Sequence, residues 1–317
     1  MDRRSKFVWI MLGVLAVVLV LIGAVAVFIF SRLGQETGPV DLRLRLEPGK
    51  SYAFSVQRSA EVSSKTDGER EKGSHSLVHD YTFDVREVDE QGNAKISVTC
   101  DRFRMRDKGK DGETEYDSAA DSAEGSESLK SRADMFDQSF SLTLSPRGRV
   151  LALDRVGEQY DQPLAEAEIS AESVRLMVEQ MDPRVGAQLV KALIEGSLAI
   201  YPEGPVQPGS RWQGEPLGEA VDGAVSPRSF QLKRRRKGIA IVTLRSEVPG
   251  TPSGIPGAEG MKMDVSSSEK GTLEIDEATG CIVRGETTEK FFFAFEMQGK
   301  RSVTSGKAWQ KVTLVEK

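Results

Sequence analysis

The chain has 317 residues, with 48 Asp and Glu against 43 Lys and Arg, two cysteines and two histidines. An acidic chain of mixed charge is a poor candidate for nucleic-acid binding. We therefore expect no nucleic-acid partner. The two cysteines and two histidines show no zinc-ligand spacing, and we expect no metal and no cofactor.

The first predicted element is a transmembrane helix over residues 7–30, which hold no charged residue and no proline. Such a helix would be about 36 Å long, enough to cross a hydrocarbon core of about 30 Å. Residues 1–6 are basic, so the positive-inside rule makes them a cytoplasmic tail and places residues 31–317 in the periplasm or outside the cell. The predicted partner of this single-pass signal-anchor is the cell-membrane bilayer. A cleaved signal peptide is the alternative, and it leads to the same compartment.

A short polar linker over residues 31–40 comes next, and from residue 41 the sequence alternates between apolar and polar residues. Leu42, Leu44 and Leu46 share one phase of this alternation, which is typical of half-buried strands. Short connections between such segments permit only antiparallel hairpins. We therefore predict a first β lobe over residues 41–154.

The pattern changes over residues 155–204, where apolar residues recur at helical spacing. Asp182-Pro183 is typical of a helix start, with Asp as the N-cap and Pro at the first helical position. We predict a helical insert here and a second β lobe over residues 205–317. The fold class is then mainly β (α+β): one transmembrane helix, then two antiparallel β lobes with a helical insert between them.

A weak internal repeat links the two predicted lobes. It pairs Leu46–Tyr52 with Val206–Trp212, each containing Pro-Gly, and it pairs later hairpins in the same order. The landmarks include Leu44-Arg-Leu-Glu-Pro-Gly-Lys-Ser-Tyr52, Glu115-Tyr-Asp-Ser118, Phe140-Ser-Leu-Thr-Leu-Ser-Pro-Arg-Gly-Arg-Val150 and Val206-Gln-Pro-Gly-Ser-Arg-Trp212. With them the chain resembles an uncharacterised bacterial envelope family, a domain of unknown function found behind signals or membrane anchors. The resemblance implies an exported β architecture and supplies no catalytic residues.

The cysteines and histidines give few options for chemistry. Cys100 and Cys281 lie in or beside apparent strands and are either a possible disulfide or two buried thiols. His75 and His79 would stand about 13 Å apart on one strand face, too far to share a metal. We interpret them as solvated strand histidines, and we expect no catalytic residue here.

Two charged stretches have simple interpretations. Residues 111–129 are acidic and small, which favours a solvated loop over a calcium site that lacks the EF-hand pattern. The basic run Lys233–Lys237 precedes a glycine and is interpreted as a charged hairpin tip that guards an edge. Contact with anionic lipid headgroups is its alternative.

The densest aromatic cluster is Phe291–Phe295. On a strand, Phe291, Phe293 and Phe295 line one face and Phe292 the other, which is typical of a central strand covered on both faces. The alternative is a curved sheet whose inner, aromatic face is lidded by helices and holds an apolar ligand.

Three functions remain open. The preferred one is a non-catalytic binding or envelope-assembly module, because no catalytic constellation accompanies the anchor and the large β domain. The first alternative is an apolar-ligand or lipid-binding protein, with Phe291, Phe293 and Phe295 as its possible lining. The second is a hydrolase with a pair of carboxylates that the sequence cannot single out.

Overall fold

The computed structural model describes residues 36–66, 68–110, 112–120, 140–154, 194–195, 197–214, 228–254, 261–297 and 300–315. These residues form twelve strands and only short helical stretches at 194–195 and 197–198. The strands are β1 (Ser51–Thr66), β2 (Glu69–Val88), β3 (Ala94–Gly109), β4 (Gly112–Asp117), β5 (Phe140–Leu144), β6 (Val150–Asp154), β7 (Arg211–Gln213), β8 (Ser229–Arg236), β9 (Ile239–Gly254), β10 (Met261–Asp276), β11 (Ile282–Met297) and β12 (Lys300–Val315).

All twelve strands belong to one antiparallel sheet. Its order is β6-β5-β3-β2-β1-β12-β11-β10-β9-β8-β7, with β4 beside β3. The mainly β prediction is confirmed, but the prediction of two lobes is wrong. The first and last long strands pair from Ala53↔Val315 to Thr66↔Ser302, so the two halves of the chain continue into one another.

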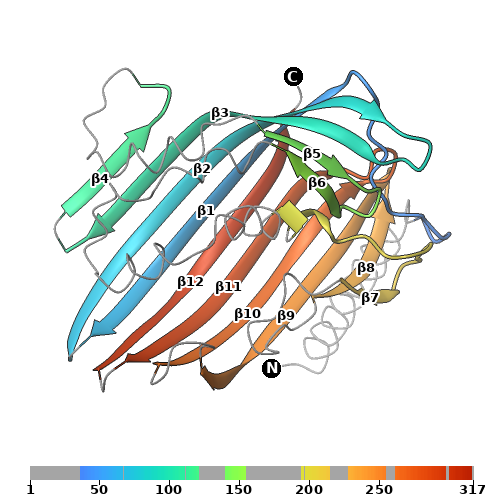
Figure 1. Cartoon of the computed structure of the whole chain (residues 1–317). Coiled ribbons are helices and arrows are strands. Elements are labelled where there is room, and N and C mark those ends of the chain that lie inside the picture. The colour runs from blue at the N-terminus through green and yellow to red at the C-terminus, as the bar shows by residue number, and fades with distance from the viewer. Residues whose placement is uncertain are drawn as a thin grey trace, which may run out of the picture.

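The sheet is strongly curved (Figure 1). The β5–β6 hairpin folds back over one face, and the segment that leads into β7 runs in front of the same face. We call this the inner face. Residues alternate between the two faces with period two, as strands require: in β3, Ile96 and Val98 are buried on the inner face, whereas Lys95 is exposed.

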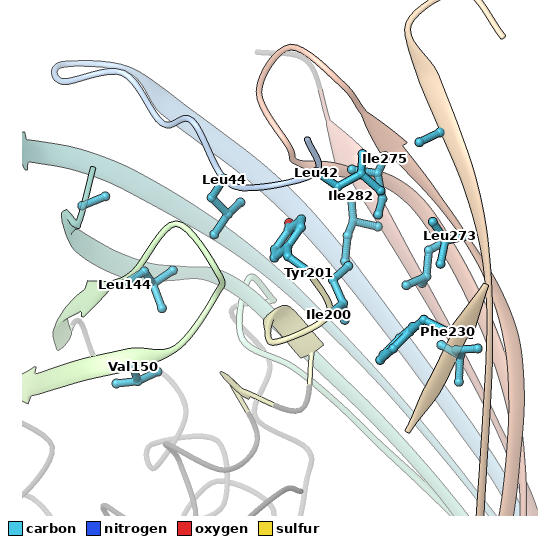
Figure 2. Packing of buried hydrophobic residues seen from close by; sticks show 14 of the residues in the cluster. Leu42, Leu44, Leu144, Val150, Ile200, Tyr201, Phe230, Leu273, Ile275 and Ile282 are labelled. Atoms are coloured by element: carbon cyan, nitrogen blue, oxygen red, sulfur yellow. The ribbon is translucent and has the colours of Figure 1, made fainter. Parts of the chain in front are cut away.

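The main hydrophobic core fills one end of the inner face, which we call the closed end. Here lie the turns that join β2 to β3, β5 to β6, β8 to β9 and β10 to β11 (Figure 1). Figure 2 shows side chains from several strands and from the segment around Tyr201 converging there. The fully buried members include Leu42, Ile96, Leu142, Phe230, Leu232, Val242 and Ile275.

Two segments cover this core, residues 40–46 and 198–206, which we call the cap segments. Val40 and Val206 join them in an antiparallel bridge, with N–O distances of 2.8 and 2.9 Å. Each cap segment crosses a hairpin of the other half of the chain. A Cβ atom at Gly280 would lie 1.9 Å from the carbonyl oxygen of Arg43, and one at Gly148 would lie 1.9 Å from that of Leu198.

The internal repeat is visible in the hydrogen bonds of the two Pro-Gly turns. The Gly49 amide donates to the Val85 carbonyl at 2.8 Å, and the Gly209 amide donates to the Leu232 carbonyl at 2.7 Å. Both glycines have positive φ, 79° and 95°, which a residue without a Cβ adopts at little cost. The two halves of the chain therefore enter the sheet in the same way.

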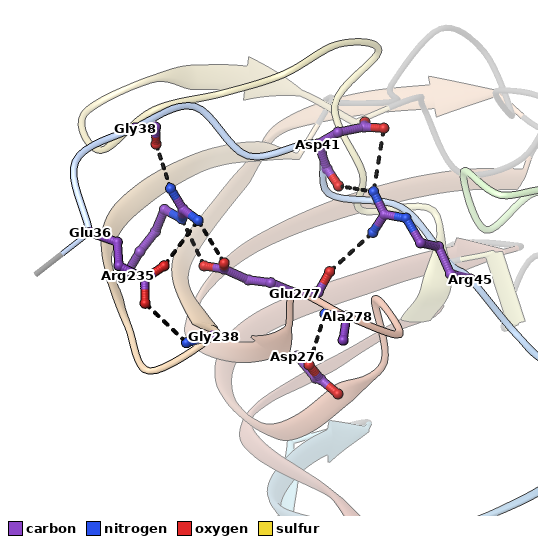
Figure 3. Close-up of polar contacts among 9 residues, drawn as sticks. All are labelled: Glu36, Gly38, Asp41, Arg45, Arg235, Gly238, Asp276, Glu277 and Ala278. Atoms are coloured by element: carbon purple, nitrogen blue, oxygen red, sulfur yellow. Dashed lines mark hydrogen bonds and ion pairs between the residues drawn. The ribbon is translucent and has the colours of Figure 1, made fainter.

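Charged residues fasten the cap to the sheet (Figure 3). The Arg235 guanidinium donates to the Glu277 carboxylate at 2.7 and 2.8 Å and to the Gly38 carbonyl at 2.5 Å. Arg45 donates to the carbonyls of Asp41 and Glu277. Because Arg235 and Glu277 are only 10% and 11% exposed, removing Glu277 would leave the Arg235 charge buried with Glu36 as its remaining ion-pair partner.

Some predictions fall outside the described residues. The transmembrane segment 7–30 and residues 155–193, most of the predicted helical insert, lie there. No helix among the described residues has the length and apolar character to span a bilayer. Residues 199–204, predicted as the end of the insert, are described and are not helical.

Candidate functional site

Beyond the closed end, the inner face continues along the long strands and changes character. Pairing registers place Arg58, Glu269 and Glu289 on the same face as the core residue Leu273. One step further along β11, the same face carries Phe291 and Phe293. A charged belt thus separates the buried core from an aromatic surface.

The belt contains two carboxylates on neighbouring strands. Glu269 of β10 and Glu289 of β11 are directly opposite in the register, where like charges repel each other. Arginines flank them on both sides. Arg228, just before β8, donates two hydrogen bonds of 3.0 and 3.1 Å to Glu269, and Arg58 of β1 lies 3.8 Å from the Glu289 carboxylate.

The two arginine–glutamate pairs differ in their hydrogen bonds and in their exposure to solvent. Arg228 and Glu269 are 21% and 15% exposed and share a bidentate contact, the strongest geometry for this pair. Arg58 and Glu289 are 49% and 33% exposed, and 3.8 Å exceeds a normal hydrogen bond. Partial burial raises the pKa of Glu289; the nearby Arg58 guanidinium opposes this shift, and the neighbouring Glu269 carboxylate adds to it.

The aromatic surface lies on the far side of the belt. We define it by Val265, Phe291 and Phe293, in strands β10 and β11. The Phe291 ring packs over Gly306 of β12, where an added Cβ would lie 2.5 Å from a ring carbon. Phe293 and Val265 are each 37% exposed.

The predicted apolar lining is therefore placed on one face. Phe291 and Phe293 lie there side by side along β11, and the backbone register puts Phe295 at the next inner position, opposite Met263. The Phe295 side chain itself lies outside the described part of the structure. Phe292 lies on the outer face, as predicted from period two.

The outer face of the same strands is mixed, with exposed polar residues in the same strands as Phe292 and the buried Ala294. Lys290 and Ser268 face each other there and are exposed. The Lys307 ammonium lies 4.5 Å from the centre of the Trp309 ring, a cation–π contact at the surface. The exposed large hydrophobic residues of β10 and β11, Val265 and Phe293, both lie on the inner face.

The prediction of solvated histidines is wrong for His79. It is 6% exposed, packs edge-on against Phe103, and its Nδ1 lies 2.7 Å from the Tyr81 hydroxyl. Burial lowers the pKa of His79 to about 4. His75 contacts the Asp107 carboxylate, and its register partners Ala60 and Asp107 place no Ser, Thr or Cys beside it.

The possible disulfide is not formed, and both cysteines are buried thiols. Cys100 belongs to a small cluster with Phe103 and Met105, apart from the main core. Cys281 lies in the β10–β11 turn region, where burial raises the pKa of its thiol to about 11. The neighbouring Gly280 carbonyl accepts a hydrogen bond from the buried Tyr201 hydroxyl at 2.6 Å.

The two charged stretches have ordinary contacts where they are described. In residues 112–117, Glu115 pairs with Arg106, and Asp117 pairs with Arg102. Among the described residues, no group of three His, Cys, Asp or Glu side chains is placed to hold a metal ion. The basic run forms the end of β8 as predicted, but Arg235 within it is buried and pairs with Glu277 and Glu36.

The four belt residues, Arg58, Arg228, Glu269 and Glu289, are not among the site residues predicted from the sequence. Arg58 and Glu289 occupy the inner phase of their strands, where the alternation predicts apolar side chains. A charge in that phase breaks the pattern and was a usable signal. Their meeting was not predictable, since it depends on the pairing of β1 with β12, whose residues lie more than 230 positions apart.

Comparisons with known proteins place the chain in a family but do not give a function. The model of a family described as "Family of unknown function (DUF6263)" matches residues 91–282. No curated protein matches. A solved structure titled "Lipid-protein interactions in lipovitellin" has 10% identity and a TM-score of 0.46, covering 85% of this chain and 25% of that one.

A DUF1329 family protein from Desulfovibrio piger has 8% identity and a TM-score of 0.16, covering 82% of this chain and 85% of that one. The chain spans only a quarter of the lipovitellin chain that it matches. Both scores are below 0.5, so neither likeness bears on function.

Proposed function

The chain belongs to the DUF6263 family of unknown function, and we propose that it is a non-catalytic protein that binds an amphiphile on its inner face. The observation that carries this proposal is the exposed aromatic surface. Val265 and Phe293 remain 37% exposed on the same face that holds the buried core. Covering an apolar side chain of this kind stabilises a complex by about 25 cal/mol per Å² of buried area.

The polarity of the two faces supports an apolar ligand over a protein partner on the outer face. The outer face of β10 and β11 presents Ser268 and Lys290, which are costly to dehydrate. The inner face presents aromatic rings bordered by charged residues, the arrangement typical of ligand sites with a few polar groups. An amphiphile satisfies both parts of this face.

The test compares lipid retention by three proteins: the wild type, Phe293→Asp and Ser268→Asp. The full chain would be purified in a mild nonionic detergent, and bound lipid would be measured by native mass spectrometry and after solvent extraction. We expect the wild type and Ser268→Asp to retain lipid and Phe293→Asp to lose most of it. Equal retention by all three, or none in the wild type, would refute the proposal.

We also propose that residues 7–30 anchor the chain in a bilayer with residues 31–317 on the non-cytoplasmic side. The support is the uncharged segment and the basic residues that precede it. A tag at the C-terminus should be cleaved by protease in spheroplasts. A tag that disappears only after lysis would contradict this topology.

One observation favours a second candidate, a carboxylate-based hydrolase. Glu269 and Glu289 face each other, and Glu289 has a raised pKa, as the general acid of such an enzyme requires. The bidentate contact with Arg228 occupies Glu269, which makes it a poor base or nucleophile. Hydrolysis of a glycoside or ester panel that Glu289→Gln abolishes, with lipid retention unchanged, would establish this alternative.

A further inference from the structure

We infer that the Arg58–Glu289 pair is the headgroup subsite for a zwitterionic phospholipid carrying a primary ammonium, the chemistry of phosphatidylethanolamine. This inference rests on the proposed function and names its ligand class. In this arrangement the headgroup lies on the belt and the acyl chains lie along the aromatic surface.

The first step is the contrast between the two pairs of the belt. Arg228 and Glu269 satisfy each other through two hydrogen bonds and are mostly covered. Arg58 and Glu289 are 3.8 Å apart and more exposed, so neither satisfies the hydrogen-bonding capacity of the other. A guanidinium favours phosphate, which it binds in a bidentate manner, whereas a carboxylate accepts from an ammonium group.

The second step is the charge balance. The belt holds two guanidinium groups and two carboxylates, so it is neutral as a whole. An anionic headgroup would pair with Arg58 but would lie against Glu289 and, beyond it, Glu269. A phosphate joined to an ammonium group compensates both members of the open pair at once. A quaternary ammonium cannot donate a hydrogen bond to Glu289, and this favours the primary amine.

The third step is the space around the pair. Arg58 reaches Glu289 across β12, where the inner position in register with Glu289 is Ala308. The next inner position of β12 is Gly306, which the Phe291 ring covers. Small residues therefore lie beneath the headgroup position, and the first aromatic ring follows Glu289 at about 7 Å along the strand.

The test titrates the full chain, in nonionic detergent, with phosphatidylethanolamine, phosphatidylcholine and phosphatidylglycerol of identical acyl chains. Native mass spectrometry measures the bound fraction of each lipid. We expect phosphatidylethanolamine to bind on the order of tenfold more tightly than the other two, since hydrogen bonds to charged groups carry the difference. Arg58→Gln and Glu289→Gln should each remove most of that preference.

A matched control is the outer-face pair of Arg284 and Glu286, which are 2.7 Å apart and more than half exposed. Arg284→Gln and Glu286→Gln should leave the preference unchanged. Equal binding of all three lipids by the wild type, with loss of all binding in Phe293→Asp, would overturn the headgroup assignment but leave the proposed function intact. Absence of any lipid binding by the wild type would overturn both.

Discussion

The two ends of the inner face are built from the same strands with the same alternation, yet only one end is sealed. At the closed end, Val242 of β9 is fully buried because the cap segments and the β5–β6 hairpin lie over that region. Further along the same face, Val265 of β10 is 37% exposed. Identical patterning thus produces a core in one place and a candidate ligand surface in the other. What covers the sheet decides between them.

The largest expected loss of stability comes from a substitution that displaces cap segment 40–46. Gly280→Ala should destabilise the fold by about 4 kcal/mol or more, because the new Cβ would lie 1.9 Å from the Arg43 carbonyl oxygen. Gly238→Ala is the control, since Gly238 has a similar φ of 72° but no atom within 4 Å of its Cβ position. The control should cost about 1 kcal/mol in chemical denaturation. Equal losses of stability in the two variants would show that the close contact between cap segment 40–46 and Gly280 does not contribute to the cost.

The next effect removes one partner of the buried Arg235–Glu277 ion pair, which joins the end of β8 to the β10–β11 turn. Glu277→Gln should cost about 3 kcal/mol, because it leaves the Arg235 charge buried with only part of its compensation. Glu286→Gln removes the partner of an exposed pair and should cost less than about 1 kcal/mol. Urea unfolding of both variants measures the difference. A loss for Glu277→Gln no larger than for Glu286→Gln would contradict this role.

A pH effect of intermediate size comes from His79, which lies on the inner face between the two ends. Its folded pKa of about 4 is below the unfolded value of 6.5. The unfolded state therefore binds the proton more readily. Stability is complete above pH 6.5 and falls as the pH drops toward 4, by about 1.4 kcal/mol per pH unit over most of this interval.

His79→Gln should flatten this part of the stability profile, since Gln does not titrate and can still accept from Tyr81. Unfolding would be followed between pH 7 and 5 in both proteins. An equally steep decline in the variant would assign the effect to other groups.

The smallest effect compares two valines directly. Val242→Ala removes methyl groups from the sealed end and should cost about 2 kcal/mol, whereas Val265→Ala should change stability by less than about 0.5 kcal/mol. Thermal unfolding of both variants provides the comparison. A similar cost at both positions would mean that the aromatic surface is packed as firmly as the core.

Local signals in the sequence predicted the later hairpins, but the strand predicted at Leu42, Leu44 and Leu46 is wrong, because these residues form a cap segment and the first strand begins at Ser51. The predicted glycine turns at Gly49 and Gly148 have positive φ, and period-two alternation correctly placed Phe292 on the face of β11 opposite to Phe291 and Phe293. The repeated Pro-Gly turns also proved equivalent in their hydrogen bonds. These features depend on residues close together in the chain, which is why sequence patterns report them.

Two features could not be predicted in this way: the single sheet that joins the two halves of the chain, and the charged belt. Both depend on β1 pairing with β12, a contact between the two ends of the described chain that no local pattern encodes. Phe293 was interpreted first as core because apolar residues on both faces of a strand favour complete covering. Its 37% exposure reflects what lies above the sheet, which strand periodicity does not contain.

The most direct test of amphiphile binding on the inner face uses an environment-sensitive fluorophore. Cysteine would be introduced in place of Phe293 on the inner face or Lys290 on the outer face; the native Cys100 and Cys281 are buried and should react slowly. Adding phosphatidylethanolamine to the labelled full chain should shift the emission at position 293 to shorter wavelength and leave position 290 unchanged. No shift at 293, or the same shift at both positions, would contradict the account.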